Sequence, residues 1–160
     1  MKAVVVYYSL DGNTELIADM VSKKVGADKI KLQPEKEIAK EGFKKFFWGG
    51  KSVIFKEKPA LLNKDLNLDS YDTVIIGTPI WAATFTPAIL SFVSLVSLKG
   101  KKVHLYACSS GGDAGKCFTK LKELLKDSTI LSTVSFKDPI KEEKQKVEQQ
   151  VDKLCSAIKE

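Results

Sequence analysis

The chain has 160 residues, with a hydrophobic fraction of 44% and a charged fraction of 29%, which is the composition of an ordinary globular protein. No apolar run approaches the roughly 20 residues that a membrane-spanning helix requires, and no cleavable signal pattern precedes the first apolar segment. The three cysteines are widely spaced, which favours neither a disulfide framework nor a metal site. We therefore expect a cytoplasmic protein that does not interact with membranes and carries no metal.

The net charge of +6 comes entirely from lysine, because the sequence contains no arginine. Bidentate guanidinium contacts to phosphates or guanine edges are thereby excluded, and we expect no nucleic-acid partner. Residues 23–64 carry twelve lysines and five acidic residues, a net charge of +7, whereas the rest of the chain has a net charge of −1. This lysine-rich segment is either a solvated surface or a docking patch for an acidic partner.

Strand-like apolar runs alternate along the chain with amphipathic segments of helical period. The expected strands are residues 2–8, 28–32, 71–77, 102–108 and 130–136, and the expected helices are residues 14–25, 87–96, 117–125 and 147–158. Such alternation predicts an α/β fold: a three-layer α/β/α sandwich around a five-stranded parallel sheet of order 2-1-3-4-5. We expect a single domain over residues 1–160. A long helical or irregular connection, about 33–68, would join the second and third strands, with a helix ending near Gly49.

Three loops rich in Gly, Ser, Thr and Pro follow the first, third and fourth strands. In this topology all three emerge at the carboxyl edge of the sheet, where ligands bind. The first loop, residues 9–14, also opens a helix, whose first N–H groups lack internal partners and favour an anion. The sequence therefore predicts a phosphate-bearing ligand at this edge.

Several other phosphate-handling sites on related folds are excluded by the residues present. A phosphoacceptor receiver needs carboxylates after the first and third strands, where this chain has Tyr8-Ser9 and Gly77-Thr78. A low-molecular-weight tyrosine phosphatase needs an arginine. The dinucleotide motif G-x-G-x-x-G and the P-loop ending G-K-[ST] are also absent.

The motif Ser9-x-x-Gly12-Asn13-Thr14 resembles the mononucleotide loop of the flavodoxin family. Residues 77–81 and 109–112 resemble the other two loops of that family, in the same order. The resemblance implies a bound FMN cofactor. The implied cofactor-binding residues are Ser9, Leu10, Asp11, Gly12, Asn13, Thr14, Thr78, Pro79, Ile80, Trp81, Ala82, Ser109, Ser110, Gly111, Gly112 and Asp113.

The resemblance also implies a role for each loop. The hydroxyls of Ser9 and Thr14, with backbone N–H groups of the first loop, would bind the 5′-phosphate. Gly12 would let the backbone approach it closely. Trp81 would stack on the isoalloxazine ring, and backbone groups of residues 109–113 would meet its pyrimidine edge.

The sequence departs from the family pattern in all three loops. Asp11 replaces a hydroxyl residue beside the phosphate. Like charges repel there by about 1 kcal/mol at 4 Å in water, so we expect the carboxylate to turn outward. Ala82 and Ala83 stand where glycine is common, which makes a positive φ less accessible and predicts weak stabilisation of a one-electron-reduced flavin. The third loop lacks an aromatic residue, so the second flavin face is either open or covered from residues 46–48.

Three functions remain open. The first is an electron carrier that shuttles electrons between redox proteins, without catalytic side chains, as a monomer or alternatively a homodimer. The second is an FMN-dependent NAD(P)H or quinone oxidoreductase with an open flavin face. The third, motivated by Asp11, is a degenerate domain that binds no flavin. We expect His104 and Cys108 to be buried structural residues.

Overall fold

The computed structural model describes residues 2–35 and 58–160, which form an alternating series of strands and helices. All strand pairings are parallel, and the sheet order is β2-β1-β3-β4-β5, as the sequence predicts. The strands are β1 (Ala3–Tyr7), β2 (Asp28–Lys31), β3 (Thr73–Pro79), β4 (Lys102–Ser109) and β5 (Thr129–Lys137). The helices are α1 (Asn13–Val25), α3 (Pro87–Leu95), α4 (Gly115–Leu124) and α5 (Lys144–Lys159).

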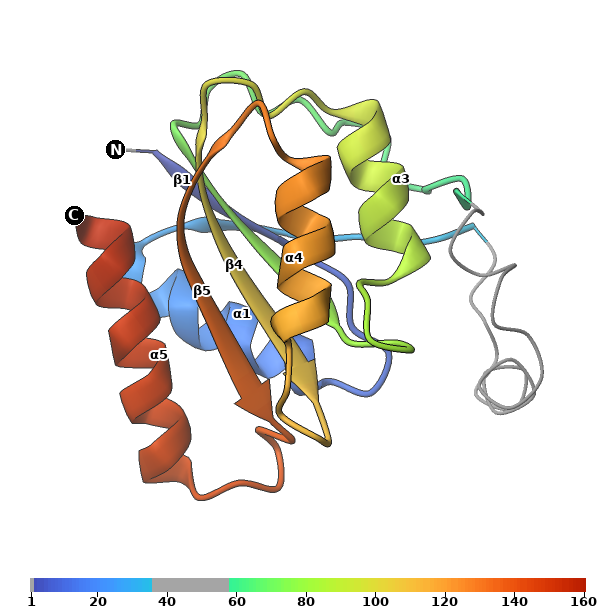
Figure 1. Ribbon diagram of the computed structural model, residues 1–160. Helices are drawn as coiled ribbons and strands as arrows, with labels where there is room; N and C mark the ends of the chain where they lie inside the picture. The colour runs from blue at the N-terminus through green and yellow to red at the C-terminus, as the bar shows by residue number, and fades with distance from the viewer. Residues whose placement is uncertain (1, 36–57) are drawn as a thin grey trace.

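Helices cover both faces of the sheet, so the predicted three-layer sandwich is confirmed (Figure 1). Successive side chains of a strand point to opposite faces, and each face has its own apolar core. Val4 and Val6 belong to the core beneath α3 and α4, whereas Val5 and Tyr7 belong to the core beneath α1 and α5. Because β1 is buried on both sides, its sequence is continuously apolar rather than alternating.

His104 is a fully buried residue of β4, as expected of a structural histidine. Its Nδ1 atom lies 2.7 Å from the hydroxyl of Ser132 on β5, and its Nε2 atom has no partner among the described residues. Burial, with a smaller contribution from Lys102, lowers the pKa of His104 to about 4. The imidazole is therefore neutral at physiological pH.

The two ends of the connection between β2 and β3 lie side by side. Pro34 and Leu61 form an antiparallel bridge, and the Glu35 N–H donates to the Ala60 carbonyl at 2.8 Å. The predicted helix ending near Gly49 and the aromatic residues 46–48 lie outside the described residues. Within 2–35 and 58–160, no helix combines the length and apolar character needed to cross a bilayer.

Candidate functional site at the carboxyl edge of the sheet

The loops after β1, β3 and β4 converge on a cavity of about 270 Å³ at the carboxyl edge of the sheet. Each of the three predicted loops contributes to its wall. The lining residues that the sequence predicted are Asp11, Asn13, Pro79, Ile80, Trp81, Ser109 and Ser110. The predicted residues that do not line it are Ser9, Leu10, Gly12, Thr14, Thr78, Ala82, Gly111, Gly112 and Asp113.

Two backbone N–H groups of the first loop are bonded to side chains of the same loop. The Gly12 N–H donates to Ser9 Oγ at 3.1 Å, and the Asn13 N–H donates to Asp11 Oδ1 at 3.2 Å. The Asn13 side-chain amide donates to Asp11 Oδ2 at 3.0 Å. The Asp11 side chain is exposed, but it curls back over its own loop instead of turning outward as we expected. The Asp11 carboxylate thus accepts a hydrogen bond from the Asn13 N–H, which a bound phosphate would otherwise accept.

The third loop repeats the design of the first. In both, a serine accepts the N–H of a glycine three residues later, and that glycine has a positive φ. For Ser9 and Gly12 the distance is 3.1 Å, and φ of Gly12 is 93°. For Ser109 and Gly112 the distance is 2.9 Å, and φ of Gly112 is 73°. A side chain would strain the backbone at either glycine, so each loop depends on its own glycine.

Thr14 brings a buried hydroxyl to this region. Its Oγ1 atom makes no hydrogen bond to an oxygen or nitrogen of the described residues, and the Cys108 thiol lies beside it. The backbone carbonyl of Thr14 accepts a hydrogen bond of 2.9 Å from Tyr106 Oη, which ties the start of α1 to β4. A buried hydroxyl without such a partner is unusual, and a phosphate oxygen reaching this loop would supply one.

Cys108 lines the cavity and is buried, as expected. Burial is the main cause that raises the pKa of its thiol to about 12, and the nearby carboxylates Asp11 and Asp138 raise it further. The thiol therefore remains protonated at physiological pH and contributes no nucleophile.

The second loop contains a tight turn with backbone strain. Trp81 and Thr84 exchange both backbone hydrogen bonds, at 2.9 and 3.0 Å, around Ala82 and Ala83. Both alanines have positive φ values, 46° and 60°, which is the geometry of a type I′ turn. We expected alanine to make such values less accessible, and here the paired Trp81 and Thr84 hold them. Each alanine stores about 1 kcal/mol of strain.

Trp81 lines the cavity, yet only 6% of its surface is exposed. Its ring packs edge-on against Tyr8, with an interplanar angle of 89° and a centroid distance of 5.8 Å. To stack on a flat ligand, the indole must turn out of this packing. The cavity is also slightly smaller than the roughly 300 Å³ at which small-molecule sites begin, so a large ring needs more room than this conformation offers.

A fourth segment, after β5, completes the site and was missed by sequence reasoning. Asp138 lines the cavity with φ of 37°, and its N–H donates to the Ser109 carbonyl at 3.1 Å. Two residues later, the Ile140 N–H donates to Asn13 Oδ1 at 3.1 Å. The Asp138-Pro139 pair is a turn signal directly after the strand, which could have marked this segment.

The wall of the cavity carries negative charge. Among the described residues that line it are the two carboxylates of Asp11 and Asp138 and no lysine. The polar groups able to meet an anion are therefore neutral N–H and hydroxyl groups. The same described part of the chain contains no cluster of His, Cys, Asp or Glu able to hold a metal ion.

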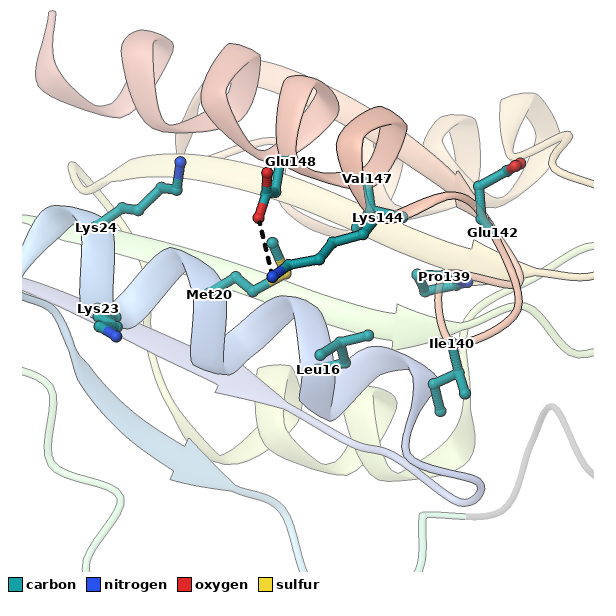
Figure 2. Close-up of a pocket in the computed structure, with 10 residues that line it drawn as sticks. All are labelled: Leu16, Met20, Lys23, Lys24, Pro139, Ile140, Glu142, Lys144, Val147 and Glu148. Carbon is teal, nitrogen blue, oxygen red and sulfur yellow. Dashed lines mark ion pairs between the residues drawn. The ribbon is translucent and has the colours of Figure 1, made fainter.

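A larger hollow of about 630 Å³ lies between α1 and α5 (Figure 2). Its floor is apolar, with Leu16 and Met20 from α1 facing Val147 from α5. At its rim, Lys144 and Glu148 form an ion pair of 3.8 Å. None of the predicted site residues lines this groove, and no glycine is among the residues that line it. The smaller cavity is therefore the candidate site.

Comparison with known proteins agrees with this geometry. A family model described as Flavodoxin matches residues 2–153. A provisionally assigned flavoprotein from Bacteroides eggerthii is 28% identical, with a TM-score of 0.79 over 96% of this chain and 97% of that one. A similarly assigned protein from Bacteroides uniformis is 24% identical, with a TM-score of 0.82 over 94% and 97%.

A more distant structure supports the fold. A flavoprotein from Lactobacillus acidophilus, solved in complex with FMN, is 16% identical, with a TM-score of 0.70 over 96% of this chain and 97% of that one. No functionally curated protein matches the chain.

Proposed function

Because the chain belongs to the flavodoxin family, we propose that it binds one FMN non-covalently at the carboxyl edge of its sheet and carries electrons between redox proteins. The observation that carries this proposal is the convergence of the three loops on one cavity. The similar flavoprotein from Lactobacillus acidophilus, solved in complex with FMN, supports the choice of cofactor.

The first loop is suited to the 5′-phosphate of FMN. The buried Thr14 hydroxyl has no oxygen or nitrogen partner among residues 2–35 and 58–160, and the Ser9 hydroxyl already orients the loop by accepting the Gly12 N–H. Both groups can turn to a phosphate oxygen, and the N-terminus of α1 adds its favourable dipole. The residues of the first loop therefore fit a phosphate group, although the carboxylate of Asp11 is an unfavourable neighbour within that loop.

The second and third loops are suited to the ring. Trp81 supplies a flat aromatic surface once its turn opens, and the Ser109–Asp113 loop supplies backbone groups without bulky side chains. FMN itself provides the redox chemistry, and the protein provides position and electrostatics. The carboxylates of Asp11 and Asp138 disfavour a gain of negative charge nearby, which favours a low reduction potential.

The second candidate function is an FMN-dependent NAD(P)H or quinone oxidoreductase. It is favoured by one observation: the third loop, Ser109–Asp113, contains no aromatic residue to cover the outer flavin face. An open face is what direct hydride transfer requires. The missing arginine speaks against strong selection of a 2′-phosphate on the nicotinamide cofactor, although lysine can also bind phosphate.

Anaerobic photoreduction of the FMN-loaded protein distinguishes the two functions. For an electron carrier, we expect absorbance spectra that show a one-electron-reduced intermediate, weakly populated because of Ala82 and Ala83, and no oxidation of added NADH or NADPH. Uptake in a single two-electron step, with rapid oxidation of either nicotinamide or reduction of a quinone, would establish the reductase and contradict the carrier.

A further inference from the structure

The first loop already holds an anion of its own, the carboxylate of Asp11. We propose that this carboxylate competes with the 5′-phosphate of the flavin, so that the site distinguishes FMN from riboflavin less sharply than a loop without this charge would. The inference rests on the proposed FMN site and names Asp11 as the residue that sets its selectivity between phosphorylated and unphosphorylated flavins.

The hydrogen bonds show how the competition arises. Asp11 Oδ1 accepts the Asn13 N–H at 3.2 Å, and Asp11 Oδ2 accepts the Asn13 side-chain amide at 3.0 Å. The remaining polar atom of that side chain, Oδ1, is engaged by the Ile140 N–H at 3.1 Å. Asn13 is thus held on two sides, and a phosphate can take its N–H only by displacing the carboxylate.

No described residue forms an ion pair that would neutralise the Asp11 charge. Among the described residues, Asp11 takes part in none of the ion pairs, and the cavity wall contains a second carboxylate, Asp138, but no lysine. When a phosphate displaces it, the carboxylate remains tethered to the same short loop. Its repulsion of the phosphate therefore persists after displacement. Riboflavin lacks the phosphate and does not meet this repulsion.

Two variants separate the charge of Asp11 from its hydrogen bonding. Asp11→Asn removes the charge and keeps an oxygen able to accept the Asn13 N–H. Asp11→Thr removes the charge and restores the hydroxyl that the family has at this position. Asp127→Asn is the matched control, because Asp127 is an exposed aspartate in the turn between α4 and β5, at the amino ends of the strands.

The measurement is the dissociation constant of each protein for FMN and for riboflavin, obtained from the quenching of flavin fluorescence. We expect both Asp11 variants to raise the ratio of the riboflavin constant to the FMN constant by at least about fivefold, the factor that corresponds to about 1 kcal/mol of relieved repulsion. The riboflavin constants and both constants of Asp127→Asn should stay within about twofold of the wild type.

Each contrary outcome has a distinct meaning. An unchanged ratio in both Asp11 variants, with FMN still bound, overturns the proposal and leaves FMN binding intact. A rise in Asp11→Thr alone overturns the role of charge, since Asp11→Asn removes the same charge. If no protein, the wild type included, binds either flavin, the proposed function fails instead.

Discussion

Gly77 leaves room for the Tyr106 ring, which connects the sheet to the start of α1, and replacing Gly77 with alanine tests that packing. Gly77 on β3 pairs in register with Tyr106 on β4. A Cβ atom at Gly77 would lie 2.5 Å from Tyr106 Cε1 and would overlap Cζ and Oη. Tyr106 is fully buried, and its hydroxyl donates to the Thr14 carbonyl in the first turn of α1. The ring cannot move without loss of this bond.

The cost of Gly77→Ala follows from these contacts. Overpacking of a filled core costs about 1–3 kcal/mol, and loss of the Tyr106–Thr14 hydrogen bond adds about 1 kcal/mol. We therefore expect the free energy of unfolding to fall by about 2–4 kcal/mol. For a chain of this size, the melting temperature should fall by at least about 4 °C.

Urea denaturation of Gly77→Ala, Tyr106→Leu and the double variant provides the assay. Leucine at Tyr106 removes the atoms that the new Cβ would strike, so the double variant should lose at least about 1 kcal/mol less than the sum of the single losses. Tyr106→Phe serves as the control, because it removes the hydroxyl and keeps the ring. Wild-type stability of Gly77→Ala, or strict additivity in the double variant, would refute the reasoning.

Four further predictions concern the site and the core. Ala82→Gly or Ala83→Gly should remove the strain of the positive φ and raise the free energy of unfolding by about 0.5–1 kcal/mol, measured from urea midpoints. His104 has a folded pKa of about 4, below its unfolded value, so the unfolded state binds more protons between pH 6.5 and 4. Stability should thus be complete above pH 6.5 and fall by about 3 kcal/mol towards pH 4, and His104→Gln should flatten this pH profile of unfolding. The Cys108 thiol, with its pKa raised to about 12, should resist iodoacetamide in the native protein at pH 8 and react in denaturant, as mass spectrometry would show; rapid native labelling would contradict its burial. Trp81→Ala should weaken FMN binding more than tenfold in a fluorescence titration, and an unchanged constant would refute a stacking role.

The fold could be predicted because its signals are local. The buried run of β1 and the helical period that follows each indicate their own element, and strict alternation leaves few topologies. The ends of the strands and the irregularities within them were less predictable. β3 extends to Pro79 because that residue pairs with Cys108 across the sheet, and β5 contains an irregularity opposite Val103 and His104 that no local pattern indicates.

The site was predictable only where glycine, serine, threonine and proline mark a loop. The segment after β5 was missed because its contact joins Asn13 to Ile140, which is 127 positions away. The prediction of the Asp11 side-chain conformation was wrong for a different reason. Repulsion by a phosphate was expected to turn the carboxylate outward, but the N–H groups of Asn13 attract it back to the loop. The single-domain assignment over residues 1–160 stays a prediction.

The most direct test of the FMN site is titration of the purified wild-type protein with FMN, followed by flavin fluorescence and absorbance. We predict saturation at one FMN per chain, with quenched fluorescence and a yellow protein after removal of free flavin. A protein that stays colourless and leaves flavin fluorescence unchanged at every concentration would contradict the central claim.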